Sequence, residues 1–180
     1  SHYFPGDREN GGVFKHAAMM FVESLFVGAK RVSSESLKER MLDDAFFMMR
    51  ETYPYEDIEN PYIKKGNPRF CCQYANPFTK EDMGPILSGT ATWLLLAIKE
   101  SMGIPFLSDK KKMLPLLEKE IGELSYIYST YQAKYSVHLH KEIGKYATHV
   151  YKFRIDGKET SNFNFDESLQ GEHVLDVYLK

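Results

Sequence analysis

A polar cluster near the start of the chain combines residue types that bind anions and sugars. Residues 6–16 read GDRENGGVFKH, so charged and amide side chains precede an apolar stretch, and His16 lies one turn inside it. The adjacent Gly11 and Gly12 allow a close approach of the backbone to another group. Few helix starts need so many polar groups for stability alone. The cluster therefore indicates a binding site, although, taken alone, an elaborate N-cap with His16 in the core is the simpler interpretation.

A second cluster, residues 87–93 (LSGTATW), places small hydroxylated side chains around a glycine where an apolar helix should begin. Backbone N–H groups without intrahelical partners, together with the helix dipole, favour an anion at such a start. The hydroxyls of Ser88 and Thr90 could add donors. Simple N-capping by Ser88 explains the same pattern in isolation. The spacing and the missing lysine exclude a P-loop.

The two clusters make a stronger case together than separately. If their helices are neighbours that start on the same face, His16 meets residues 88–90. An imidazole, two hydroxyls and backbone amides would then converge on one point. That combination predicts a phosphate or sulfate pocket, completed by a cation such as Arg8 or a residue outside this chain.

Other reactive side chains fit structural roles better. His138 and His140 have metal-like spacing on one strand face, but no third ligand is near in sequence, which favours a solvent-facing strand. The triplet 110–112 (KKK) is too short for a nucleic-acid patch. The adjacent Cys71 and Cys72 indicate reduced thiols in an intracellular protein. No Gly-x-Ser-x-Gly elbow or catalytic Cys–His pair can be argued.

Length and composition exclude several classes of protein. A chain of 180 residues fits one mid-sized domain or two small ones. With 43% hydrophobic and 27% charged residues, it is not collagen-like, of low complexity or wholly disordered. The net charge of −2 gives no global field that recruits nucleic acid or an anionic membrane. No apolar run is long enough for a membrane span, and without a visible signal peptide we expect a cytoplasmic location.

The elements that must position these residues change type near residues 103–105. Helical spacing predicts helices over 13–28, from Ser34 (with Ser33 or Ser34 as N-cap) to Met49, and over 88–102 with Gly103 as the stop. Alternation predicts strands over 123–130, 135–139, 151–155 and 175–179, with a hairpin at Asp156-Gly157. Several short alternating strands suggest a sandwich.

A long stretch without helical periodicity, residues 53–87, separates the second and third helices. It holds five prolines, and its aromatic residues are Tyr53, Tyr55, Tyr62, Phe70, Tyr74 and Phe78. Irregular segments of this length are uncommon unless they are functional. Two interpretations stay open on composition alone, an aromatic sugar-binding cleft and loops packed on a helical layer.

Both clusters resemble motifs of glycoside hydrolase family 94, the inverting disaccharide and oligosaccharide phosphorylases once called glycosyltransferase family 36. Residues 8–17 (RENGGVFKHA) resemble one motif, and residues 87–93 with Gly103-Ile104 are similar to the second phosphate-site motif. The order of helices and strands also fits. The resemblance covers essentially the whole chain, but only the C-terminal fifth or so of such an enzyme. Residues 5–10 (PGDREN), 66–70 (GNPRF) and the SGTATW form look most like the 1,2-β-oligoglucan phosphorylase branch.

The resemblance implies an α+β composite fold. Residues 1–104 would be the last helices of an (α/α) toroid or barrel, with the long aromatic loop, and residues 105–180 an antiparallel β-sandwich. It also implies cleavage of a β-glucosidic bond in a glucooligosaccharide by inorganic phosphate, which yields α-glucose 1-phosphate. Phosphate is a co-substrate, so no cofactor and no metal is expected. By carry-over, His16, Ser88 and Gly89 would bind phosphate with Thr90 as adjacent support, and Arg8, with Glu9 and Asn10 beside it, would contact the donor sugar.

One departure limits what the chain could do by itself. The general acid of the family is an aspartate well upstream of these motifs, and nothing here matches it, so no catalytic residue is assigned. We expect a fragment whose barrel helices have lost neighbours, and exposed apolar faces then predict self-association or a companion chain that completes the barrel. Two alternatives to a phosphorylase piece are a non-catalytic carbohydrate-binding module and a pure assembly fragment.

Overall fold

The computed structural model describes residues 2–52, 71–79, 81–104, 113–147, 149–161, 163–165 and 169–180. The chain divides into two compact units, Ser1–Lys99 and Glu100–Lys180, so the division precedes the change of periodicity at 104/105. Contacts within the second unit explain the difference. The Leu116 N–H donates to the Ser101 carbonyl over 2.7 Å, and the Tyr126 hydroxyl donates to the Met102 carbonyl over 2.9 Å.

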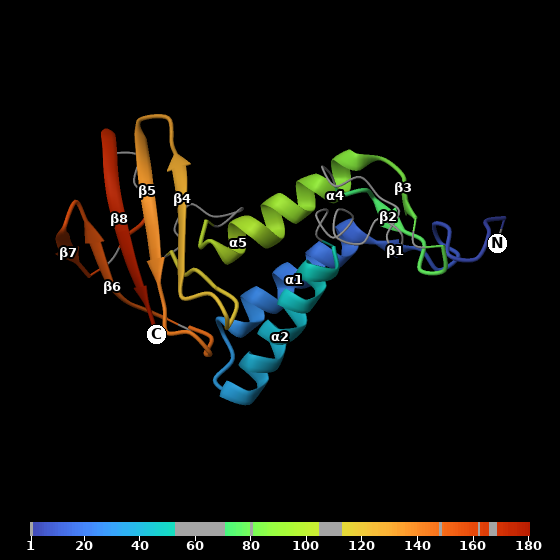
Figure 1. Cartoon of the computed structure of the whole chain (residues 1–180), viewed down its shortest axis with the longest axis horizontal. Helices are drawn as coiled ribbons and strands as arrows, with labels where there is room; N and C mark the ends of the chain where they lie inside the picture. The colour runs from blue at the N-terminus through green and yellow to red at the C-terminus, as the bar shows by residue number, and fades with distance from the viewer. Residues whose placement is uncertain are drawn as a thin grey trace. The chain divides into compact units, whose positions relative to one another are not determined.

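Three helices make up most of the described part of the first unit (Figure 1). They are α1 (Lys15–Ala29), α2 (Glu35–Glu51) and a third helix over 86–101, which consists of α4 (Ile86–Thr92), the π-helical η1 (Trp93–Ile98) and α5 (Lys99–Ser101). The side chain of Ser34 caps α2 by accepting the Leu37 N–H over 3.4 Å. The predicted cap is therefore confirmed, and it supplies a partner for one of the otherwise unpaired N–H groups of the first turn.

Helix α1 packs against both α2 and the third helix. Between α1 and α2, the rings of Phe26 and Phe46 lie 5.2 Å apart. Met19 and Val22 of α1 and Leu42 and Met49 of α2 are also buried. Burial of each such side chain contributes about 1.5–3 kcal/mol. A helix that is apolar on more than one side thus has neighbours on more than one side, as its sequence predicts.

The third helix ends where predicted but begins earlier. Gly103 has a φ of +76°, and its N–H donates to the Glu100 carbonyl over 3.1 Å. The helix begins at Ile86 and not at Ser88, because Pro85 takes the N-cap position without a side-chain cap. Proline suits that place, since its missing N–H would have had no intrahelical partner. The expectation that Ser88 caps this helix is therefore wrong.

A small antiparallel sheet links the starts of α1 and α4. Its strands are β1 (Val13–Phe14), β2 (Tyr74–Ala75) and β3 (Asp82–Met83), in the order β1-β2-β3. Residues 13–14 are thus a strand and not the first turn of α1, because their backbone pairs with β2 and the Lys15 N–H donates to the Gln73 carbonyl over 2.8 Å. The stretch 53–87 is likewise not irregular throughout, although residues 53–70, with four of its aromatic residues, lie outside the described ranges.

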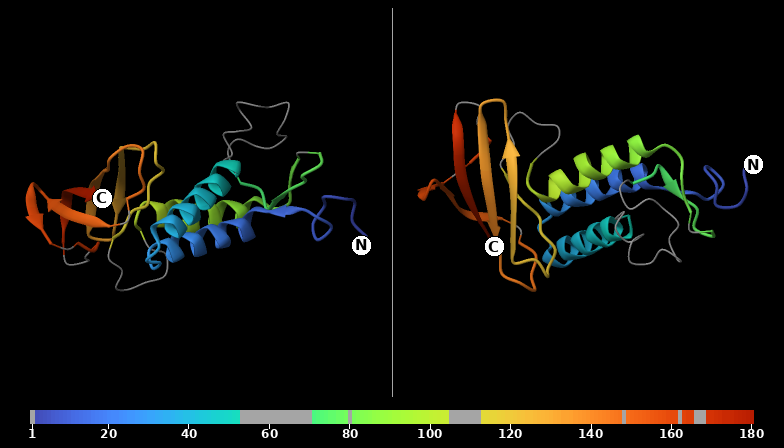
Figure 2. Two further views of the ribbon diagram at one scale, coloured as in Figure 1. Left: turned by 90° about the horizontal axis from the view of Figure 1, so that it is seen from below. Right: turned by 45° about the horizontal axis from the view of Figure 1, so that its top comes forward.

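The second unit is built on one five-stranded sheet (Figures 1 and 2). The strands are β4 (Glu123–Ser129), β5 (Ala133–His140), β6 (Val150–Ile155), β7 (Lys158–Thr160) and β8 (Gly171–Leu179), in the order β4-β5-β8-β6-β7. The predicted hairpin is present, because Asp156 and Gly157 both have positive φ between β6 and β7. The chain therefore has the α+β class.

The sheet differs from the expected antiparallel sandwich in two respects. Strand β8 inserts between β5 and β6 and runs parallel to β5, so the sheet is mixed. Its buried face, which includes Tyr135, Val137 and Leu175, is packed by loop residues such as Phe163 and Met113. Within the described ranges, loops thus cover part of the face that a second sheet would cover in a sandwich.

Two further structural expectations concern membranes and basic residues. Among the helices in the described ranges, none combines the length and the apolar character that crossing a bilayer requires. The lysine triplet 110–112 lies outside the residues that the structure describes.

Candidate anion-binding site

The small sheet places the starts of α1 and α4 side by side. Phe14 of β1 pairs with Tyr74 of β2, which pairs with Met83 of β3. Strand β1 leads directly into α1, and β3 leads through Gly84-Pro85 into α4. Both helices begin beside this sheet and pack against each other (Figures 1 and 2). The structure therefore brings together the two helix starts that the sequence predicts to converge.

Two of the predicted phosphate ligands have buried polar atoms without a partner. These atoms are Nδ1 of His16 and Oγ of Ser88, and neither has a hydrogen-bond partner within the described part of the chain. An unsatisfied buried polar atom costs about 1–3 kcal/mol, so such atoms are rare unless a ligand or function uses them. The imidazole of His16 meets the Phe14 ring edge to face, with centroids 5.5 Å apart at 87°.

A buried ion pair holds the start of α1 against β3. The Lys15 ammonium lies 2.6 and 2.7 Å from the two carboxylate oxygens of Asp82, and each side chain is only 9% exposed. The pair fixes the residue next to His16 but leaves no free charge for a ligand. This pair could not be identified from the sequence, where its signal is a lysine within an otherwise apolar helix start.

The other residues of the second cluster contact the segment before β2. The Thr90 hydroxyl accepts the Cys71 N–H and donates to the Cys71 carbonyl, both over 3.2 Å. A Cβ on Gly89 would lie 2.2 Å from the Cys72 carbonyl oxygen, so only glycine permits this close approach. Gly89 and Thr90 thus anchor the segment 71–72 to α4, and Thr90 would have to break two bonds to bind an anion.

The rings of Tyr74 and Phe14 connect Arg8 to His16. The Arg8 guanidinium lies 5.3 Å from the centroid of the Tyr3 ring, and the neighbouring hydroxyls of Tyr3 and Tyr74 raise the pKa of Arg8. The Tyr74 ring lies 5.4 Å from the Phe14 ring, which contacts His16. Arg8 itself is exposed and has a φ of +44°. Arg8, the cation predicted for the site within this chain, therefore stands at its solvent side.

Asn76 anchors the loop that carries Arg8, Glu9 and Asn10. Its amide nitrogen donates to Asp7 Oδ1 over 3.0 Å, and its oxygen accepts two backbone N–H groups, those of Phe78 and Thr79. Asn76 is only 4% exposed. Its role was not predicted from the sequence, because nothing near residue 76 indicates a partner so far away along the chain. Glu9 is exposed, and Asn10 Nδ2 donates to the Tyr3 carbonyl over 2.8 Å.

The two strand histidines lie on the face of β5 opposite the buried Val137 and Leu139, as predicted, and they are half-buried and paired there. His140 Nε2 lies 3.2 Å from Asp176 Oδ1, and His138 Nδ1 lies 2.8 Å from Ser125 Oγ. Neighbouring strands supply these partners, which the sequence alone could not assign. In the ranges that the structure describes, no group of three or more metal-ligating side chains comes together.

No protein-family model matches this chain, and no curated protein matches it significantly.

Proposed function

We propose that the chain is the C-terminal, phosphate-binding part of an inverting phosphorylase that transfers a glucosyl unit from a β-linked glucooligosaccharide to inorganic phosphate. One observation supports this proposal above the others. Two polar atoms that are buried without a partner among the described residues, His16 Nδ1 and Ser88 Oγ, belong to the two clusters in which the sequence predicts phosphate ligands. Both clusters stand at helix starts that one small sheet holds together.

The donor set suits a phosphate ion. An imidazole N–H and a serine hydroxyl donate hydrogen bonds to phosphate oxygens, and such bonds to an anion are stronger than those between neutral groups. Arg8 supplies a cation at the exposed side of the same region. Lys15 cannot serve in this way, because Asp82 already neutralises it. Gly89 and Thr90 support the site by holding the segment 71–72 against α4.

The reaction divides the chemistry between this chain and another part of the enzyme. A phosphate oxygen forms a bond to the anomeric carbon while the bond from that carbon to the leaving oxygen breaks. A carboxylic acid outside this chain donates the proton to the leaving oxygen. Phosphate is already anionic, so no general base is required. What these residues supply is a preorganised set of donors for the attacking anion.

Each of the two units corresponds to one part of the proposed enzyme. Helices α1, α2 and the third helix are the last helices of an (α/α) barrel, and the second unit, with its mixed five-stranded sheet, is the C-terminal β domain that follows the barrel. Large apolar side chains remain exposed on these helices, among them Met20, Phe21, Phe47 and Leu94. Such a surface supports contact with the remainder of the barrel, or with a second copy of the chain.

A non-catalytic glycan-binding module is the second candidate. Phe4 and Phe78 are 81% and 71% exposed. They stand on two loops that Asn76 joins, since Asn76 bonds to the carbonyl of Pro5 and to the N–H of Phe78. Exposed aromatic rings on anchored loops suit the apolar face of a sugar ring, and no phosphate is needed for that contact.

Calorimetric titration with inorganic phosphate tests the first candidate. We expect binding to the wild-type chain and a loss of at least about tenfold, or 1.4 kcal/mol, in each of His16→Ala and Ser88→Ala. His2→Ala replaces an exposed histidine and should not change the affinity. Equal affinity in all variants contradicts the assignment. Oligosaccharide binding that is unaffected by phosphate, and that Phe78→Ala removes, would favour the second candidate.

A further inference from the structure

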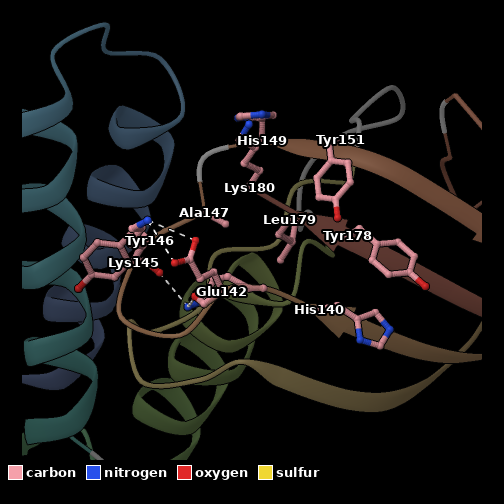
Figure 3. A pocket seen from close by; sticks show the side chains of 11 residues that line it. His140, Glu142, Lys145, Tyr146, Ala147, His149, Tyr151, Tyr178, Leu179 and Lys180 are labelled. Carbon is pink, nitrogen blue, oxygen red and sulfur yellow. Dashed lines mark hydrogen bonds and ion pairs between the residues drawn. The ribbon is translucent and has the colours of Figure 1, made fainter.

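A cavity of about 760 Å³ opens in the second unit, at the end of the sheet where β5 and β8 end and β6 begins (Figure 3). Its volume falls in the range of small-molecule sites. All of its lining residues belong to the second unit, so it is separate from the site at His16 and Ser88.

The cavity has apolar side chains between two sets of aromatic rings. Ala147 and Leu179, which are 2% and 4% exposed, lie between them. Figure 3 shows Tyr146 on one side and Tyr151 with Tyr178 on the other. A ring-shaped ligand would therefore have apolar surface on more than one side.

Tyr178 is held between two side chains, whereas Tyr151 is largely exposed. His140 on β5 and Lys152 on β6 are the register partners of Tyr178 and flank its ring. The imidazole of His140 stacks on the ring at 4.8 Å and 20°, and the Lys152 ammonium lies 4.0 Å from its centroid. Tyr151 is 58% exposed, and the Lys152 ammonium lies 5.8 Å from the centroid of its ring, so part of the ring remains open to a ligand.

Positive charge dominates the lining. The lining includes three lysines, Lys141, Lys145 and Lys180, and one glutamate, Glu142. Lys141 donates to three carbonyls, those of Lys119, Glu142 and Lys145, so its ammonium holds the loop in place. Lys145 and Glu142 form an ion pair of 3.2 Å in which both side chains are more than 70% exposed. An exposed pair of this kind is weak, so an anionic ligand can compete for the lysine.

From this cavity we infer that the second unit binds a small anionic sugar, such as a hexose that carries a phosphate group. The apolar side chains and Tyr151 take the sugar ring, and Lys145 and Lys180 take the acidic group. The Glu142 carboxylate, the His149 imidazole and the tyrosine hydroxyls offer both acceptors and donors. Sugar hydroxyls use both, whereas a simple aromatic acid uses only the donors.

Calorimetry on the full chain with glucose 6-phosphate, glucose and inorganic phosphate tests this inference. We expect glucose 6-phosphate to bind with a Kd on the order of 1 mM or below, and each of the other two at least about tenfold more weakly. Tyr151→Ala and Lys180→Gln should each weaken glucose 6-phosphate about fivefold or more. Matched controls are Tyr131→Ala and Lys134→Gln, which replace exposed residues away from the cavity.

Several results would overturn the inference. Glucose as tight as glucose 6-phosphate would indicate a neutral sugar site, and phosphate as tight would indicate an anion site without a place for the ring. Absence of binding to the wild-type chain at about 10 mM ligand, or equal affinity in all folded variants, excludes the site. Circular dichroism checks that each variant folds. His16→Ala must leave the affinity for glucose 6-phosphate unchanged, which separates this site from the proposed phosphorylase site.

Discussion

Lys15 and Asp82 lie 67 positions apart in the chain, yet the ammonium of one is 2.6 Å from a carboxylate oxygen of the other. Lys15 opens the helix that carries His16, and Asp82 lies on the strand that leads to Ser88. The ion pair therefore holds together the two halves of the candidate anion-binding site. The geometry of that site therefore depends on two side chains that do not themselves bind the anion.

Removal of one partner of this pair should destabilise the protein strongly. Each side chain is 9% exposed, so Asp82→Asn or Lys15→Met leaves a buried charge without compensation. We expect a loss of about 3–5 kcal/mol for either single change, measured by urea unfolding. The double variant Lys15→Met/Asp82→Leu should recover most of this loss. Similar losses in the single and double variants would show that the buried charge is not the cause.

Ser88→Ala should stabilise the protein while it weakens phosphate binding. The Ser88 hydroxyl oxygen is buried without a partner in the part of the chain that the structure describes. Its removal relieves an unsatisfied group and improves helix propensity, for an expected gain of about 1–2 kcal/mol in the free energy of unfolding. Ser24→Ala is the matched control, because that hydroxyl donates to the Phe21 carbonyl within α1. A gain no larger than in the control would mean that the Ser88 hydroxyl has a hydrogen-bond partner in the folded protein.

Two glycines in helices should respond oppositely to alanine. The Cβ of Gly89→Ala would meet the Cys71 and Cys72 carbonyl oxygens at 2.5 and 2.2 Å. Rigid backbone cannot move aside easily, so we expect a loss of about 1–3 kcal/mol. In Gly28→Ala the nearest atom is the flexible Met41 sulfur at 3.3 Å, and helix propensity favours alanine by up to about 1 kcal/mol. Thermal unfolding of both variants checks the sign of each effect.

The ion pair between His173 and Asp156 should make stability depend on pH. His173 Nδ1 lies 2.9 Å from Asp156 Oδ2 and Nε2 lies 3.1 Å from the Gln170 carbonyl, so both nitrogens face acceptors. The hydrogen bond to Asp156 raises the pKa of His173, and the same bond lowers the pKa of Asp156. The folded state therefore binds a proton on His173 more tightly than the unfolded state does.

The sign of the pH effect follows from these two shifts. The stabilisation from His173 is fully present below its ordinary pKa of 6.5 and is lost as pH rises through the higher folded value. The stabilisation from Asp156 is present above 3.8 and is lost as pH falls through its lowered folded value. We expect the Tm difference between the wild type and His173→Gln to be largest between these limits and to shrink as pH rises above 6.5, through the raised folded pKa of His173. A difference that does not change with pH contradicts the charged pair.

Loss of the Tyr126 hydroxyl should weaken the start of the second unit. This hydroxyl donates to the Met102 carbonyl over 2.9 Å, and burial raises the pKa of Tyr126. Tyr126→Phe leaves the carbonyl without this donor, so we expect a loss of about 1–2 kcal/mol in urea unfolding. Tyr131→Phe, at a fully exposed tyrosine, should change nothing. A loss in both variants would point to a general effect of removing a hydroxyl.

Local patterns in the sequence predicted most of the regular elements. The cap at Ser34, the stop at Gly103 and the hairpin at Asp156-Gly157 each depend on a few neighbouring residues. The two-residue strands β1, β2 and β3 escaped prediction, because strands this short carry no measurable period and form only when distant segments pair. The parallel pairing of β5 with β8 also escaped it, since the alternation of side chains is the same in parallel and antiparallel strands.

The sequence by itself determined the helix and strand periods, their local caps and turns, and the identity of the residues that could bind an anion, because these depend on side-chain type and near spacing. The tertiary structure decided which of those residues have partners. Thr90 is bonded to Cys71 and Lys15 is neutralised by Asp82, whereas His16 and Ser88 keep buried atoms without a partner among the described residues. The tertiary structure also created the cavity in the second unit, because the lining of that cavity comes from three strands and a loop. Hydrogen bonds and charge pairs between distant segments form only after the chain has folded, so spacing in the sequence cannot assign them.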